Sequence, residues 1–208
     1  MSSFLPAADE SATSTPKELI PTGTHEAYCY GCVDLGTQER KPYMGKEKSP
    51  ARKIMLYFEF PDIRSRFKED GPEEPRVKSQ SFTYFTSENS ALTALCKAWL
   101  GKNVKDVDFG TLAGTPASIT IAHEPAKADP TKIYDNMVSI TALSPKLVPL
   151  MTPQYNENMN FSILQDGFDS PKFEKLYDWV KKIIMESAEY KEYLSGPKMP
   201  NDENPFGA

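Results

Sequence analysis

The order of hydrophobic patterns along the chain is the feature that most limits how it can fold. Five segments alternate apolar and polar side chains with a period of two, which is typical of half-buried strands. They span residues 24–35, 53–60, 77–85, 116–122 and 133–141. Between the third and the fourth, Leu92, Leu95 and Trp99 recur at helical spacing. Residues 86–88 before them (TSE) suit the start of a helix.

The predicted order is therefore strand, strand, strand, helix, strand, strand, which is the order of an OB-fold. An OB-fold is a five-stranded barrel that presents a sheet face and flanking loops to oligonucleotides or oligosaccharides, and the loop joining its first two strands is one of the usual binding loops. The long alternation of strands and helices that marks a parallel sheet is missing. A generic β-sandwich or another small barrel remains the alternative.

The chain of 208 residues is long enough for one domain with extensions. Residues 1–22 are rich in Ser, Thr, Ala and Pro, so we expect a flexible arm. Residues 23–165 are predicted to form the OB-fold domain. Over residues 166–195 a helix is expected, capped by Asp169 or Ser170 with Pro171 at its first position. Residues 196–208 are expected to be a disordered acidic tail.

The apolar side of the expected C-terminal helix carries Phe173, Leu176, Val180, Ile183 and Ile184. Such a stripe packs on its own domain or forms a homodimer contact. A homodimer therefore stays possible at this point.

The net charge of −5 argues, taken alone, against a nucleic-acid-binding protein. The negative charge is concentrated at the ends of the chain, however. Residues 1–22 hold one basic and three acidic side chains, and residues 151–208 hold 6 basic and 10 acidic ones. Residues 23–150, in contrast, hold 17 basic and 16 acidic side chains. Residues 36–53, expected as the loop between the first two strands, carry a local charge of +4. A basic loop fits a solvated surface or a phosphate-binding surface.

Aromatic side chains accompany the basic ones, and both are needed to bind single-stranded nucleic acid without strong sequence preference. Five aromatic residues are expected on strand faces opposite the aliphatic core: Tyr28, Tyr30, Tyr57, Phe82 and Tyr84. They would stack on bases, or else cover the barrel or lie under the C-terminal helix. Seven basic residues are predicted to neutralise phosphates: Arg40, Lys41, Lys46, Lys48, Arg52, Lys53 and Lys78.

Catalytic and metal-binding motifs are weak. Cys29 and Cys32 form a CxxC, but no second pair of ligands is spaced for zinc, so the cysteines are expected to be small buried hydrophobic residues. No Walker A loop, GxGxxG or GxSxG occurs. The sequence therefore predicts no enzyme, no cofactor and no metal. A third alternative is a metal-dependent nuclease using Glu59 and Asp62.

The composition also bears on location. The longest apolar runs have four or five residues, as in residues 54–58, against the roughly 20 that cross a bilayer. The N-terminus has no signal-peptide pattern, and an odd count of 3 cysteines suits a reducing compartment. We expect a soluble cytoplasmic protein with no membrane contact.

Short motifs along the barrel segment also carry a resemblance to a known family. They are residues 23–25 (GTH), 33–38 (VDLGTQ), 57–61 (YFEFP), 89–92 (NSAL), 98–102 (AWLGK) and 112–116 (LAGTP). With these motifs, residues 23 to about 160 resemble a family of bacteriophage single-stranded DNA-binding proteins with an OB-fold. The resemblance covers about two thirds of the chain. It implies a non-enzymatic role in phage DNA replication, recombination or repair in the cytoplasm of an infected bacterium.

The end of the chain is similar to the acidic tip of bacterial single-strand binders. Its partner-binding residues would be Asp202, Glu203, Pro205 and Phe206. The chain continues to Gly207 and Ala208, so Phe206 lacks the terminal carboxylate that partners of such tips grip. The resemblance implies phage or host replication proteins as partners of this tail, which is also expected to compete with DNA for the barrel. The alternative from another class is a virion or assembly protein that uses the barrel for protein contacts only.

Overall fold

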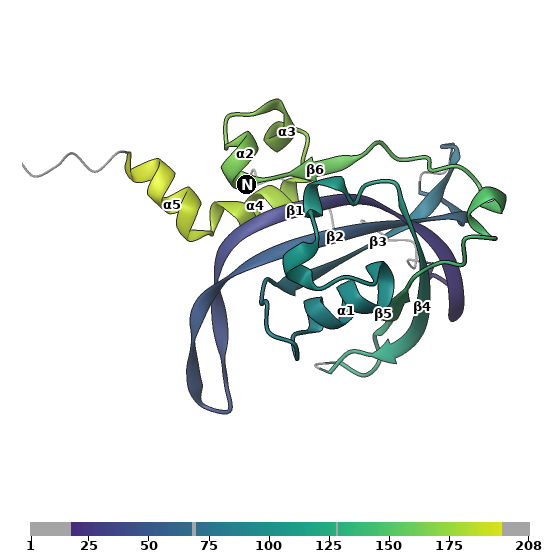
Figure 1. The fold of residues 1–208 in the computed structure, drawn as a ribbon, viewed down its shortest axis with the longest axis horizontal. Coiled ribbons are helices and arrows are strands. Elements are labelled where there is room, and N and C mark those ends of the chain that lie inside the picture. The colour runs from purple at the N-terminus through teal and green to yellow at the C-terminus, as the bar shows by residue number, and fades with distance from the viewer. Residues whose placement is uncertain (1–17, 68–69, 128, 197–208) are drawn as a thin grey trace, which may run out of the picture.

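The computed structural model describes residues 18–67, 70–127 and 129–196, and its centre is a nearly closed antiparallel β-barrel (Figure 1). The barrel strands are β1 (Gly23–Tyr43), β2 (Lys46–Arg66), β3 (Glu73–Thr83), β4 (Thr115–Pro125) and β5 (Ile133–Thr141). Their order in the sheet is β3-β2-β1-β4-β5. Helix α1 (Ala91–Leu100) joins β3 to β4, followed by the 3-10 turns η1 (Val104–Asp106) and η2 (Phe109–Thr111). The predicted mainly-β, OB-like barrel with a helix between its third and fourth strands is confirmed.

The connection between β1 and β2 differs from the expected loop. The two strands stay paired from Gly36 opposite Lys53 to Tyr43 opposite Lys46, so residues 36–53 form a long hairpin. Met44 and Gly45 form its turn, and both have positive φ angles of 50° and 74°. Turns of this kind match the twist of the paired strands. The sequence did not reveal the strands because residues 39–50 of the hairpin are mostly exposed on both faces, and so they lack the alternation of a half-buried strand.

Strand β2 also continues past Pro61, where it was expected to end. The pairing of β2 with β3 shifts between Phe60 and Arg64 and then resumes to Arg66. A bulge of this kind accommodates a proline, because the residue there needs no ladder hydrogen bond. Two other boundaries differ from the predicted ones. Strand β3 begins at Glu73, four residues before the predicted Val77. Helix α1 begins at Ala91, where the Ser90 hydroxyl accepts a hydrogen bond from the Thr93 N–H.

The barrel interior holds one cluster of buried apolar side chains. Phe58, Leu56 and Ile119 from the strands pack there with Leu92 and Trp99 of α1. The indole N–H of Trp99 donates to the Pro116 carbonyl at 2.8 Å, which ties α1 to β4. The apolar side of the predicted short helix therefore packs into the barrel interior, and α1 closes one end of the barrel.

Ile20 belongs to the same interior cluster and is fully buried. Its N–H donates to Asp135 of β5 at 3.0 Å, and its carbonyl lies 2.8 Å from Nε2 of His123 on β4. The expectation of a flexible arm over residues 1–22 is therefore wrong for residues 18–22. Residues 1–17 lie outside the described part of the chain, as do residues 197–208, which include the predicted partner-binding tail.

A second apolar cluster lies on the outer face of β1 and β2. Val33, Leu35 and Met55 of the strands are covered there by the C-terminal helices, whose Val180 and Ile184 are fully buried. The stripe predicted on residues 173–184 therefore packs on its own domain.

The C-terminal region is a series of short elements and not the single helix predicted over residues 166–195. They are η3 (Val148–Leu150), β6 (Met159–Phe161), α2 (Ile163–Asp166), α3 (Pro171–Glu174), α4 (Asp178–Met185) and α5 (Ala188–Ser195). Ser170 and Ser187 cap α3 and α5 with their hydroxyls, and such local side-chain bonds favour new helix starts. Strand β6 pairs in parallel with β1 at residues 31–33.

Cys29 and Cys32 both point into the barrel interior although they are three residues apart on a strand. The pairing of β1 with β2 shifts between Cys29 and Gly31, so the extra residue Tyr30 restores the inward direction for Cys32. Burial raises the pKa of the Cys29 thiol to about 12 and that of Cys32 well above its usual value. Both thiols therefore stay protonated and behave as small apolar residues, as the sequence predicted.

Candidate nucleic-acid interface

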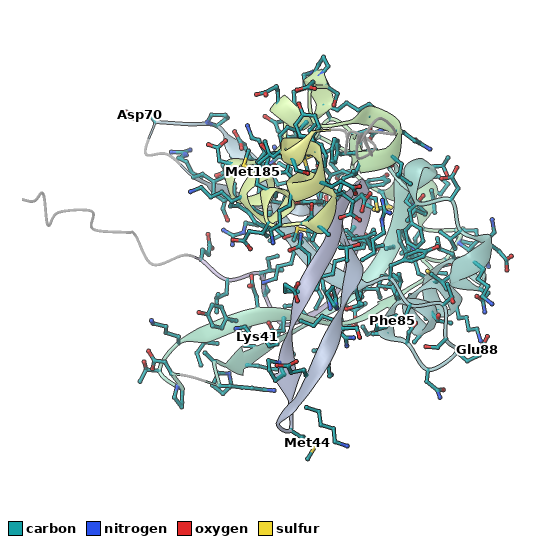
Figure 2. All side chains as sticks on the ribbon, turned by 90° about the vertical axis from the view of Figure 1, so that its left-hand side faces the viewer. Lys41, Met44, Asp70, Phe85, Glu88 and Met185 are labelled. Atoms are coloured by element: carbon teal, nitrogen blue, oxygen red, sulfur yellow. The ribbon has the colours of Figure 1, made fainter. Side chains whose placement is uncertain are left out.

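The β1–β2 hairpin, residues 36–53, extends away from the barrel as a two-stranded ribbon (Figure 2). Lys41 and Lys46 lie near its end and are exposed, with no ion pair to any described residue. Met44 at the turn is 86% exposed. Six of the seven predicted phosphate-binding residues, at positions 40, 41, 46, 48, 52 and 53, thus lie on this hairpin.

Aromatic side chains lie where the hairpin leaves the barrel. The guanidinium of Arg40 lies over the ring of Phe85, 5.1 Å from its centroid. The neighbouring Tyr84 meets Phe109 of η2 edge-on, with 6.0 Å between ring centroids. Tyr84 and Phe85 are 37% and 39% exposed, which leaves ring surface for a ligand. Of the five predicted stacking residues, Tyr84 is the one that the structure places beside the basic hairpin.

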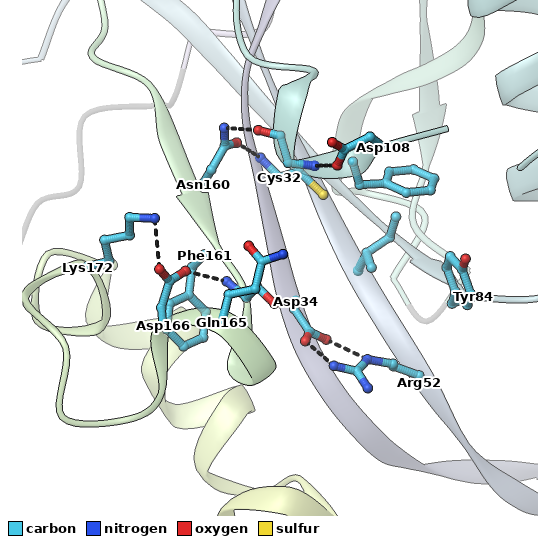
Figure 3. Close-up of a pocket in the computed structure, with 14 residues that line it drawn as sticks. Cys32, Asp34, Arg52, Tyr84, Asp108, Asn160, Phe161, Gln165, Asp166 and Lys172 are labelled. Carbon is cyan, nitrogen blue, oxygen red and sulfur yellow. Dashed lines mark hydrogen bonds and ion pairs between the residues drawn. The ribbon is translucent and has the colours of Figure 1, made fainter. Parts of the chain in front are cut away.

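A pocket of about 470 Å³ opens next to Tyr84 (Figure 3), and we call it the mouth pocket. Side chains from five places in the chain line it: Cys32 and Asp34 of β1, Arg52 and Ile54 of β2, Tyr84 after β3, residues 108–110 around η2, and residues 160–172 of the C-terminal region. Ligand sites in proteins commonly have volumes of about 300–1,000 Å³. The mouth pocket is thus large enough for a small organic group.

Asp34 holds the base of the hairpin together. Its carboxylate accepts the Gly36 N–H at 3.1 Å, the Arg52 Nε at 3.0 Å, and the Ile163 N–H at 3.3 Å, and it also forms an ion pair with Arg52 Nη2. Arg52 was predicted to neutralise phosphates. With Asp34 as its partner it serves chiefly to join β2, β1 and α2.

The polar wall formed by the C-terminal region is equally well fixed. Asn160 accepts the Cys32 N–H at 3.0 Å and donates to the Gly110 carbonyl at 2.8 Å. Asp166 accepts the Ser162 N–H and Lys172 Nζ, both at 2.8 Å. Burial raises the pKa of Asp166, but these two donors outweigh it and the net pKa is lowered. The carboxylate therefore remains charged at neutral pH.

Three of the predicted stacking residues are buried, and the expectation that they bind bases is wrong for this structure. Tyr30 and Tyr57 are each 2% exposed and lie under the C-terminal helices. Tyr57 contacts Tyr177 and Trp179, with ring centroids 6.2 and 6.5 Å apart. Phe82 is 8% exposed and points into the barrel interior. Tyr28 is half-buried opposite Glu59, away from the hairpin.

Lys78 also differs from its predicted role. Its ammonium forms an ion pair with Asp135, whose side chain is 5% exposed. Since β3 and β5 are the two ends of the strand order, this pair spans the gap that leaves the barrel open. Lys53 is half-buried on β2 and forms no ion pair within the described residues. It remains a candidate for phosphate contact, whereas Lys78 stabilises the barrel.

The two carboxylates of the nuclease alternative, Glu59 and Asp62, lie in different surroundings. Glu59 is fully buried and accepts the N–H groups of Tyr155 and Asn156, both at 2.7 Å, and the Asn156 side-chain amide at 2.6 Å. Asp62 is exposed and bonds to the Thr152 hydroxyl. Within the described ranges no group of three or more His, Cys, Asp or Glu side chains could hold a metal ion. Glu59 is thus part of the scaffold.

Sequence reasoning did not identify Phe85, Phe109 or the polar pocket residues. Phe85 follows Tyr84 directly, so two adjacent aromatic residues at a strand end were a usable signal. Phe109 lies more than 50 residues beyond the hairpin, and the lining residues of the C-terminal region lie more than 100 residues beyond it, so only the fold brings them to it.

None of the helices in the described ranges is both long and apolar enough to cross a membrane. Comparisons with models of protein families, with curated proteins and with solved structures gave no match.

Proposed function

We propose that this protein binds single-stranded DNA along the β1–β2 hairpin and the aromatic residues at its base. The observation that carries the proposal is the position of Arg40 over Phe85, next to Tyr84. This contact places the basic side chains of the hairpin next to the exposed rings of Tyr84 and Phe85. Single-strand binders combine these two ingredients, because cations follow the phosphates while flat rings stack on bases.

The energies involved are sufficient for useful affinity. Each stacked base contributes about 1–3 kcal/mol, and each phosphate that a lysine neutralises adds a salt-dependent term. A paired duplex hides the faces of its bases, so Tyr84 and Phe85 gain nothing from it. We therefore expect single strands to bind more tightly than duplexes of the same sequence. The resemblance of the sequence to phage proteins supports a role in phage DNA replication, recombination or repair.

The first test is titration of a fluorescein-labelled 30-nucleotide single strand by fluorescence anisotropy, beside its duplex and the RNA of the same sequence. The double variant Lys41→Glu/Lys46→Glu should weaken binding at least tenfold and reduce the salt dependence. Lys146→Glu is the matched control, because this exposed lysine lies between β5 and η3, away from the hairpin. No binding by the wild-type protein, or equal loss in both variants, would overturn the proposal.

A second test addresses stacking. Phe85→Ala should weaken binding about fivefold or more at every salt concentration, because stacking does not depend on counterions. Tyr134→Ala provides the control, since Tyr134 is 49% exposed on β5, far along the sheet order from the hairpin. An unchanged affinity in Phe85→Ala would remove this ring from the site.

One observation favours a second function, that of a virion or assembly protein. Helices α4 and α5 expose Trp179, Met185 and Leu194, which are 47%, 41% and 67% exposed. Apolar side chains of this size on adjacent helices suit protein contacts. Light scattering during size-exclusion chromatography distinguishes the two functions. A defined oligomer that does not bind DNA would favour assembly.

A further inference from the structure

We propose that the mouth pocket receives one unstacked nucleobase from the bound strand, and that it prefers bases with an exocyclic amino group. This inference rests on the proposed function, since the strand must first lie along the hairpin. The pocket adjoins Tyr84 and Arg52 at the hairpin base (Figure 3), so a strand held by the hairpin passes its opening.

The size and walls of the pocket suit a single base. Its volume of about 470 Å³ exceeds that of one base but does not admit a run of stacked nucleotides. Tyr84 and Phe109 supply aromatic surface, and Ile54 and Phe161 supply apolar surface. A flat ring gains stacking energy there that it would otherwise obtain only from neighbouring bases.

The charges of the pocket favour a base over a phosphate. Asp34, Asp108 and Asp166 line it, against Arg52 and Lys172. Arg52 is paired with Asp34 and Lys172 with Asp166, so Asp108 leaves the lining with one uncompensated negative charge. A phosphate is repelled by this lining. The base therefore enters, and its phosphates remain outside with the hairpin lysines.

Asp108 is also the group that can read the edge of the base. Its Oδ1 accepts the Gly110 N–H at 2.9 Å, whereas its Oδ2 has no partner among the described residues. A carboxylate oxygen accepts a hydrogen bond from an exocyclic amino group, as Asp and Glu do with cytosine N4. Thymine has no exocyclic amino group, and its single donor on this edge, N3–H, lies between two carbonyl oxygens that the carboxylate repels. Cytosine, adenine and guanine are therefore favoured over thymine.

The amide of Gln165 provides a second polar contact on the opposite side. Figure 3 places Gln165 across the pocket from Tyr84, and its side chain has no hydrogen bond to any described residue. Asn160, by contrast, is fixed by Cys32 and Gly110 and holds the wall in place. The pocket is thus formed before a ligand arrives, and two of its polar groups, Asp108 Oδ2 and the Gln165 amide, have no hydrogen-bond partner within the described ranges.

The test compares a 20-nucleotide strand of thymidine with the same strand carrying one central deoxycytidine, measured by competition in fluorescence anisotropy. The wild-type protein should bind the substituted strand about tenfold more tightly. Asp108→Asn should abolish or reverse this preference, because the amide keeps the Oδ1 acceptor and replaces the free oxygen with a donor. Affinity for the thymidine strand should not fall below the wild-type value, because the variant also removes the repulsion between the carboxylate and the thymine carbonyl oxygens.

Two further variants keep the test decisive. Asp106→Asn makes the same charge change on η1, outside the pocket lining, and should retain the preference. Gln165→Trp fills the pocket from an exposed position, so it should remove the preference without unfolding the chain. Equal affinity of the wild-type protein for the two strands, or a preference that survives both pocket variants, would overturn the pocket inference and leave the proposed function standing. No binding of either strand would instead defeat the proposed function.

Discussion

Thr37 and Glu189 are 152 residues apart in the sequence, and Thr37 donates two hydrogen bonds to the Glu189 carboxylate. The Thr37 N–H does so at 2.7 Å and its hydroxyl at 2.8 Å. Next to this contact, the Gln38 amide donates to the Ile183 carbonyl at 2.9 Å. The C-terminal helices therefore hold the base of the hairpin and set the direction in which the hairpin leaves the barrel.

Glu189→Gln should lower the free energy of unfolding by about 1 kcal/mol at pH 7, because its hydrogen bonds lose their charge. Burial raises the pKa of Glu189, but the two bonds from Thr37 and the positive charge of Arg52 outweigh burial and lower it. The stabilisation is therefore present above the unfolded pKa of about 4.3 and is lost as the pH falls through the folded pKa. Urea denaturation of both proteins between pH 7 and pH 3 measures this. A difference that persists undiminished at the acid end would contradict the assignment.

Gly36→Ala should destabilise the fold by about 3 kcal/mol or more, whereas Gly45→Ala should cost about 1 kcal/mol. Both glycines have positive φ, at 71° and 74°. A Cβ on Gly36 would lie 2.6 Å from the Ser187 Cβ, whereas a Cβ on Gly45 meets nothing within 4 Å. The Gly45 variant thus isolates the backbone strain, and the difference reports the packing of α5 on the hairpin. Equal losses by thermal denaturation would show that this packing is loose.

Glu59→Gln should destabilise the protein by about 2–3 kcal/mol, since its amide group cannot accept all three donors around it. Asp62→Asn is the control and should change the free energy of unfolding by less than about 0.5 kcal/mol, because Asp62 is exposed. Both variants and the wild type should leave labelled DNA intact in the presence of magnesium or manganese. Cleavage by the wild type that Glu59→Gln abolishes would revive the nuclease alternative.

Lys78→Met should lower the free energy of unfolding by about 2–3 kcal/mol, because Asp135 loses its ion-pair partner in a buried setting. Burial raises the pKa of Asp135, but Lys78 and the Ile20 N–H outweigh it and keep the pKa low. DNA affinity should change less than twofold. Lys132→Met removes an exposed ion pair with Asp129 and should be almost neutral. A large loss of DNA affinity in Lys78→Met at unchanged stability would restore Lys78 to the binding surface.

Removal of residues 197–208 should tighten DNA binding severalfold, because these residues carry Asp202 and Glu203 on the same chain as the basic hairpin. An attached anionic segment competes with DNA at high local concentration. Anisotropy titration at low and at physiological salt measures the effect, which should shrink at the higher salt. Unchanged or weaker binding would exclude this competition.

The barrel was predictable because each of its strands alternates side chains that face the barrel interior with side chains of a different kind. Ile54, Leu56, Phe58 and Phe60 alternate with other residues along β2, and β5 was predicted with the bounds that the structure gives it. The hairpin was missed as a pair of strands for the opposite reason. Its residues 39–50 are mostly exposed on both faces, so their sequence carries no alternation.

The aromatic residues show where periodicity misleads. Tyr30 and Tyr57 were placed correctly on the strand faces opposite the barrel interior. A strand pattern alone does not tell whether such a face meets solvent or a later helix, and here α3 and α4 cover it. The mouth pocket was beyond prediction because Asp34, Asp108 and Gln165 meet only in the folded chain.

The contact between Asp34 and the Ile163 N–H spans 129 residues, and that between Thr37 and Glu189 spans 152. Contacts between residues so far apart slow folding, because a large loop must close before they form. During synthesis on the ribosome the hairpin residues therefore emerge well before Ile163 and Glu189, their partners in these contacts. The DNA-binding surface that we propose is therefore completed only after α5 has been translated, and a chain truncated before α5 would carry a hairpin that lacks the support of Glu189.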